Sequence, residues 1–167
     1  HDRGIFLIQD NGMKRVTDIT GAWCCQQVMN RKGLMYIGVY NGIYLVEKTD
    51  GEWRVVCKLA GLTDSNRLFE QEDARTIWMY TTDHITHIKL SENLTKVTSV
   101  KDYDTKDGFP SKNHIYPAKI KGRIYFARPS GIYKRYFHKD MMESYPDINN
   151  LPNSTATYSR LLEYNDH

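Results

Sequence analysis

The sequence lacks most features that would assign a location or a partner directly. No apolar run approaches the roughly 18 residues that cross a membrane as a helix, and the formal net charge of +3 comes from no block of lysine or arginine. Because nucleic-acid-binding proteins gather positive charge on one face, we expect neither direct membrane insertion nor a nucleic-acid partner. The chain starts at His1-Asp2 rather than at methionine, and we expect it to be part of a longer protein.

Cysteine is scarce, with Cys24, Cys25 and Cys57 as the only examples, and no Cys-x-x-Cys spacing occurs. Adjacent cysteines rarely bridge each other. Two interpretations remain open, a disulfide from Cys57 to Cys24 or Cys25 and three buried small apolar residues on strands. The pattern favours the second. The cysteines therefore do not fix the redox compartment.

Catalytic fingerprints are also missing. The chain has no Gly-x-Ser-x-Gly elbow, P-loop or dinucleotide-binding fingerprint. His84 and His87 are three residues apart, which puts them on opposite faces of a strand. Glycoside cleavage needs two carboxylates roughly 5 to 9.5 Å apart, yet Asp73 and Asp107 lie in turn motifs and are expected to serve structure. We therefore expect no metal, no cofactor and no enzymatic activity in this region.

Aromatic residues are abundant, and they recur with a period. The chain has 12 tyrosines, three tryptophans and five phenylalanines, a composition that favours strands. Residues 34–45, 76–87 and 123–134 can be aligned, each with an aromatic at the third position and an isoleucine after a turn. The aromatic anchors Tyr36, Trp78 and Tyr125 are 42 and 47 residues apart. This spacing is typical of a four-stranded propeller blade.

The repeat predicts an all-β chain of β-propeller blades, each a four-stranded antiparallel sheet. We place full blades at about 23–58, 66–100 and 113–146, with a hairpin turn at Asn41-Gly42. The ends, residues 4–19 and 155–163, are expected to be partial blades that together supply a split blade. A ring closed in this way would have about four blades, the low end of the usual range. We favour an arc of a larger propeller, whose open edges predict a homo-oligomer.

The register also makes predictions for single residues. Tyr36, Trp78 and Tyr125 are each expected to pack between two sheets. The turns at one end of the blades surround the central channel, and their aromatic, amide and arginine side chains suit an oligosaccharide. The predicted ligand-binding residues on this rim are Trp23, Tyr40, Asn41, Asn66, Arg67, Thr82, Asn113, His114 and Arg128.

The repeats resemble the two-component regulator propeller repeat, in which a Gly-Leu-Pro-Ser-like turn precedes a Gly-x-Ile-Trp strand and a Gly-Leu turn. Asp107-Gly-Phe-Pro-Ser111 is followed here by Gly122-Arg-Ile-Tyr125 and by Gly131-Ile132, and Glu72-Asp73 precedes Ile77-Trp78. Tyrosine replaces the tryptophan in two copies, and Asp83 replaces the turn glycine in another. The likeness covers nearly the whole chain.

This resemblance implies a periplasmic sensor region of a bacterial hybrid histidine kinase or related regulator. Signalling domains and further propeller blades would lie elsewhere in the parent chain, and carbohydrate fragments would be the ligands. Two alternatives stay open. One is a protein-interaction scaffold without a small ligand, and the other is a propeller hydrolase or lyase that acts on glycans.

Overall fold

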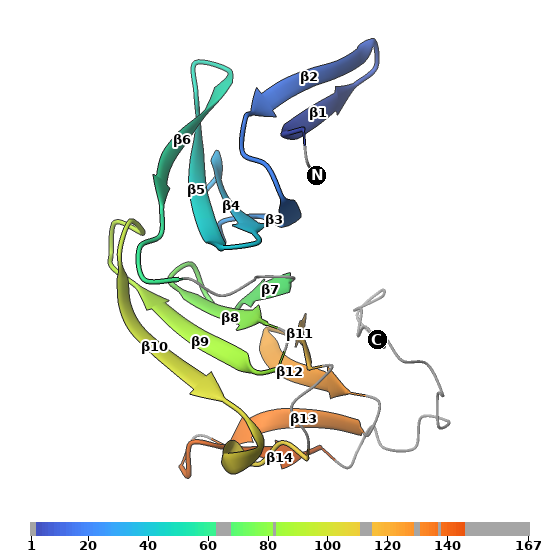
Figure 1. Ribbon diagram of the computed structural model, residues 1–167, viewed down its shortest axis with the longest axis vertical. Coiled ribbons are helices and arrows are strands. Elements are labelled where there is room, and N and C mark those ends of the chain that lie inside the picture. The colour runs from blue at the N-terminus through green and yellow to red at the C-terminus, as the bar shows by residue number, and fades with distance from the viewer. Residues whose placement is uncertain are drawn as a thin grey trace.

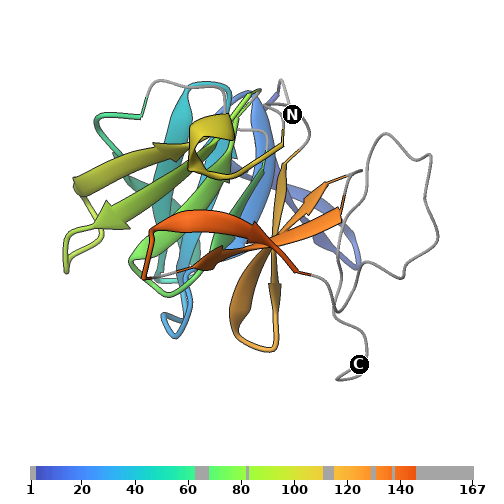
Figure 2. The same cartoon turned by 90° about the horizontal axis from the view of Figure 1, so that it is seen from below.

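Three four-stranded antiparallel sheets and one two-stranded hairpin follow one another along the chain (Figure 1). This computed structural model describes residues 3–62, 68–81, 83–110, 115–128, 131–136 and 138–145. Its one helical element is a single 3-10 turn, η1 (Thr105–Asp107). Seen from below, the third sheet lies in front and the earlier sheets lie behind it, so the sheets stack in chain order (Figure 2). The predicted all-β architecture of propeller blades is confirmed.

Each full sheet is a meander in which every strand pairs with the next one along the chain. The first blade consists of β3 (Ala22–Gln27), β4 (Leu34–Val39), β5 (Gly42–Thr49) and β6 (Glu52–Lys58). The second consists of β7 (Leu68–Gln71), β8 (Thr76–Tyr80), β9 (Ile85–Leu90) and β10 (Val97–Tyr103). The third consists of β11 (Tyr116–Ile120), β12 (Arg123–Arg128), β13 (Gly131–Tyr136) and β14 (Met141–Ser144).

The N-terminal hairpin, β1 (Ile5–Gln9) and β2 (Gly12–Thr17), has the character of half a blade. Gly4 precedes it with φ 108°, and Gly42 and Gly131, which open the third strands of two full blades, have φ 132° and 136°. An isoleucine follows each glycine. The hairpin therefore corresponds to the third and fourth strands of a blade. The predicted partner strand within residues 155–163 lies outside the described residues.

One turn differs from its prediction by a residue. Val39 pairs with Gly42, so the two loop residues between β4 and β5 are Tyr40 and Asn41 rather than Asn41 and Gly42. Gly42 belongs to β5, and its φ of 132° is one that residues with a Cβ rarely adopt. The shift moves the Tyr40 side chain from the end of a strand onto the tip of the turn.

Aromatic residues on the second strand of each blade fill the space between blades. Tyr36 is completely buried among residues of the second blade, and its hydroxyl donates a hydrogen bond to the Ala74 carbonyl at 2.9 Å. Trp78 is buried against Phe126 of the third blade and donates to the Glu72 carboxylate at 2.9 Å. The predicted packing of these two anchors between sheets is confirmed.

Tyr125 does not follow this prediction. It is only half-buried, and its ring packs against Tyr145, 5.4 Å away between centroids. The alternation along β12 points Phe126 toward the second blade and Tyr125 toward the opposite face. No sheet of the described residues covers that face. Tyr125 therefore points in the same direction as Tyr36 and Trp78, but no further blade buries it.

The innermost strands of neighbouring blades are joined by a glutamine network. The Gln71 amide nitrogen donates to the Gln26 side chain at 3.0 Å and to the Gln27 carbonyl at 2.9 Å, and its oxygen accepts from the Met29 backbone N–H. Gln71 is buried, and a buried amide is costly unless both ends are bonded. The network thus fixes β7 against β3.

Cys24 and Cys57 pack against the core between the first and second blades, as expected of small apolar residues. Cys25 and Cys57 carry free thiols, and Cys25 is exposed rather than buried, contrary to the prediction. In the part of the chain that the structure describes, no helix has the length and apolar character needed to span a bilayer.

Asp140 ties the outer strand of the second blade to the third blade. Its carboxylate accepts hydrogen bonds from Lys101 at 2.5 Å, from the Tyr103 hydroxyl at 2.7 Å and from Arg135 Nε at 2.7 Å. The bond from Lys101 and those from Tyr103 and Arg135 hold the pKa of Asp140 well below its usual range. Burial raises the pKa of Tyr103, and its hydrogen bond to Asp140 raises that pKa further.

Removal of the Asp140 charge should lower stability and flatten its acid dependence. A carboxyl with a depressed folded-state pKa stabilises the fold above its unfolded pKa of about 3.9 and loses that effect as the pH falls through the folded value. Asp140→Asn should cost about 1–2 kcal/mol at pH 7, a figure discounted for partial exposure. Asp50→Asn is the matched control, because both aspartates have φ near 50° (53° and 52°). Urea unfolding from pH 7 to pH 2 would show equal losses for the two variants if the prediction is wrong.

The anchors should differ in energetic weight according to their burial. Tyr36→Ala and Trp78→Ala should each lower the free energy of unfolding by about 3–5 kcal/mol, because each opens a cavity between blades. Tyr125→Ala should cost only about 1–2 kcal/mol, since less area leaves water on folding. Chemical denaturation measures all three. A Tyr125 loss as large as that of Trp78 would show that a further layer covers the third blade.

Candidate functional site

Two exposed aromatic residues meet at one end of the first blade. Trp23 lies near the start of β3 and Tyr40 at the β4–β5 turn. Their rings are in edge contact, with centroids 5.4 Å apart and planes at 87°. Each residue is 53% exposed, although tryptophan is usually highly buried. We call Trp23 and Tyr40 the rim pair.

The Tyr40 ring of the rim pair packs directly against the backbone of a glycine. Gly21 has φ 71°, and a Cβ placed on it would lie 2.4 Å from Cδ2 of Tyr40. The Tyr40 ring therefore rests on the Gly21 backbone in a position that a larger residue would block. Thr20 and Asn41 complete a hollow of about 300 Å³ beside the ring, and Asn41 is exposed. The hollow offers a hydroxyl and an amide next to an aromatic face.

Only part of the predicted binding set can be located. Trp23, Tyr40 and Asn41 come together on the first blade, as described above. The other predicted positions except Arg128, namely Asn66, Arg67, Thr82, Asn113 and His114, lie outside the described residues.

Arg128 differs from its predicted place on the exposed rim. It is 5% exposed, and its guanidinium carbon lies 5.8 Å from the centroid of the Phe109 ring, in the layer between the second and third blades. Burial lowers its pKa. The alternation that points Phe126 toward the second blade also points Arg128 there, because the two are two residues apart on β12. Arg128 is thus a residue of the core between blades.

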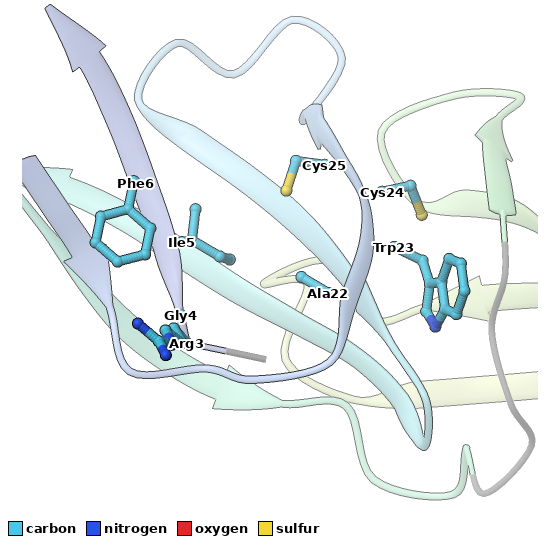
Figure 3. A pocket seen from close by; sticks show the side chains of 8 residues that line it. All are labelled: Arg3, Gly4, Ile5, Phe6, Ala22, Trp23, Cys24 and Cys25. Carbon is cyan, nitrogen blue, oxygen red and sulfur yellow. The ribbon is translucent and has the colours of Figure 1, made fainter. Parts of the chain in front are cut away.

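A groove that sequence reasoning missed lies between the hairpin and the first blade (Figure 3). It has a volume of about 530 Å³ and is lined by Arg3, Gly4, Ile5, Phe6, Ala22, Trp23, Cys24 and Cys25. Among the described residues β1 pairs with β2 alone, and its other edge faces this groove. In a complete blade that edge would pair with a second strand. Trp23 of the rim pair thus lines a groove beside a strand edge that no other described strand pairs.

A second hollow, which we call the blade-three slot, opens between β12 and β13. Its volume is about 720 Å³, and it is lined by Glu72, Trp78, Gly122, Arg123, Ile124, Tyr125, Phe126, Lys134, Arg135, Tyr136, His138 and Tyr145. One feature of the repeat alignment could have indicated this slot. Lys134 and Arg135 stand where Leu45 and Val46 are buried in the first blade.

Several aspartates and histidines make local structural contacts. Asp73 accepts from the Arg75 backbone N–H at 2.7 Å, and Asp104 and Asp107 form a capping box around η1. His84 contacts Asp83, whereas His87 is stacked on Trp78 with ring centroids 4.3 Å apart. Among the described residues, no group of three or more His, Cys, Asp or Glu side chains is placed to hold a metal ion.

A glycine pair tests how the rim pair is positioned. Gly21→Ala and Gly51→Ala both place a Cβ at positive φ, of 71° and 81°, which should cost about 1 kcal/mol each. Only Gly21→Ala meets the Tyr40 ring, since nothing lies within 4 Å of a Cβ at Gly51. Gly21→Ala should therefore cost about 1–2 kcal/mol more and alter the near-ultraviolet circular dichroism. Identical spectra and identical losses for both variants would contradict this geometry.

No protein-family model matches the chain, and no curated protein matches it significantly. The repeat architecture and the sites described above are therefore the basis for any functional assignment.

Proposed function

We propose that this chain is the ligand-sensing propeller region of a larger regulator and that it binds carbohydrate fragments at the rim pair. The observation that carries the proposal is the exposed, perpendicular contact between Trp23 and Tyr40. Aromatic rings match the apolar faces of sugars, while Asn41 and Thr20 in the adjoining hollow can bond to hydroxyl groups. The resemblance of the repeats to the two-component regulator propeller supports a sensor in the periplasm.

A preorganised pair favours binding over a purely structural role. Trp23 and Tyr40 come from one blade whose β4–β5 ladder is paired along its whole length. The Gly21 backbone fixes the Tyr40 ring further. A surface that is already ordered loses little conformational entropy when a ligand binds. Because both rings leave about half of their surface in water, a ligand that covers them would add hydrophobic free energy that the fold alone does not supply.

A protein-interaction scaffold is the second candidate, and the hairpin favours it. Ile8 is 81% exposed and Met13 is 74% exposed, on paired positions of β1 and β2, and Phe6 and Leu7 beside them are also exposed. An exposed apolar patch next to an unpaired strand edge is typical of a surface that takes up another chain. Self-association of the isolated chain would be the simplest form of this activity.

Titration with short neutral glycan oligomers of differing linkage tests the proposal. A binding oligomer should change the fluorescence of Trp23, and at 100 times its dissociation constant it should stabilise the fold by roughly 2.7 kcal/mol. Trp23→Ala and Tyr40→Ala should each weaken binding by about tenfold or more, equivalent to at least ~1.4 kcal/mol. Calorimetry provides the affinities of both variants.

Val100→Ala is the matched control, because Val100 is an exposed apolar residue on β10 of another blade. It should bind like the unmodified chain. If Trp23→Ala retained full affinity, the rim pair would not be the site. If no glycan bound and light scattering showed a stable multimer, the scaffold function would replace the sensor function.

A further inference from the structure

The blade-three slot exists because one ladder is incomplete. Strands β12 and β13 pair only from Phe126–Tyr133 to Arg128–Gly131, three residue pairs. The equivalent β4–β5 ladder has six pairs and the β8–β9 ladder has five. Figure 1 shows β12 and β13 diverging along their length. Arg123–Tyr125 and Lys134–Tyr136 therefore pair only with β11 and β14 on their outer sides.

The sequence gives a physical reason for this opening. In the first blade, Leu45 and Val46 occupy the middle of the third strand, and both are buried. Lys134 and Arg135 take these places in the third blade. Arg135 has an anionic partner in Asp140. Enclosing the Lys134 ammonium in a closed sheet between packed layers would be costly without such a partner. The opened ladder leaves both side chains on the wall of a hollow instead.

The charges that line the slot are not balanced within it. Asp140 bonds Arg135, and the Glu72 carboxylate accepts from Trp78 and lies 3.7 Å from His87 Nε2. The His87 imidazole and the Trp78 bond lower the pKa of Glu72. Both acids are thus engaged by other groups. No carboxylate of the described residues forms an ion pair with Arg123 or with Lys134, so these two cations leave the slot positive.

Aromatic rings stand next to these cations. The Lys134 ammonium lies 4.7 Å from the centroid of the Tyr145 ring, and Tyr145 packs on Tyr125. Tyr136 also lines the slot. The volume of about 720 Å³ falls within the roughly 300–1,000 Å³ of small-molecule sites. Flat apolar surfaces beside two uncompensated cations fit a ring that bears a negative group.

We propose that the blade-three slot is a second binding site, which takes a small ring-bearing anion, with Arg123 and Lys134 holding the anionic group. A carboxylate and a phosphate monoester share the chemistry that these cations recognise. The tyrosines contact the ring. This site is separate from the rim pair and does not rest on the function proposed there.

Calorimetric titration with three probes tests the site. Glucuronate carries a carboxylate, glucose 6-phosphate carries a phosphate, and glucose is the neutral match for both. At least one anion should bind while glucose does not, and the affinity should fall as salt rises, because the cations are partly exposed to solvent. The stronger of the two anions identifies the preferred group. Equal binding of glucose, or no binding of either anion at millimolar concentration, would overturn the proposal.

Charge-neutralising variants locate the bound anion. Arg123→Gln and Lys134→Gln should each reduce affinity about tenfold or more, whereas Lys89→Gln, an exposed lysine on β9, should leave it unchanged. Circular dichroism melts establish that each variant is folded. Trp23→Ala should bind the anion normally, which separates this site from the rim pair. Equal affinities for Lys134→Gln and Lys89→Gln would show that the anion does not lie in the slot.

Discussion

The structure depends on one repeated interaction, the burial of a second-strand aromatic residue against the next blade. A meander of four strands has two faces, and its own loops cannot cover both. Tyr36 and Trp78 each cover one face by packing against the following blade. The Tyr36 hydroxyl bonds to the Ala74 carbonyl, and the Trp78 indole N–H bonds to the Glu72 carboxylate. A buried polar group is costly when unbonded. The Tyr36 bond joins two blades and so helps to fix the first blade against the second, whereas the Trp78 bond lies within the second blade.

The same dependence explains where the unusual surfaces lie. Both ends of the stack lack a covering layer among the described residues. The slot belongs to the third blade at one end, and the groove lies between the half-blade at the other end and the first blade. The rim pair has another origin. Trp23 and Tyr40 belong to a complete blade that is covered on both faces, so their exposure does not come from a missing neighbour. That difference makes the rim pair the stronger candidate for a site that the isolated chain retains.

Local pattern was enough to predict the blades, because alternation, turns and aromatic spacing can all be read within one repeat. Tyr125 was wrongly predicted to be buried, since burial depends on a layer beyond the repeat. Arg128 was placed on the rim by its nearness to a turn, although strand alternation points it toward Phe109. The rim pair was predictable because a strand start and a turn share one end of a blade. The slot depends on an interrupted ladder, which neither strand reveals alone.

One position on the third strand, opposite the aromatic anchor of the second strand, changes in chemical character from blade to blade. It is occupied by Leu45 in the first blade, by His87 in the second and by Lys134 in the third. Leu45 is buried by packing alone, and His87 is buried by stacking on Trp78. Lys134 cannot be enclosed by apolar packing, because desolvating an unpaired ammonium would cost several kcal/mol. A layer that covers the third blade would therefore have to leave Lys134 open to water or bring it into an ion pair, for which Glu143 is its cross-strand neighbour on β14. The third blade thus differs from the others in the chemistry of its outer face as well as in its place at the end.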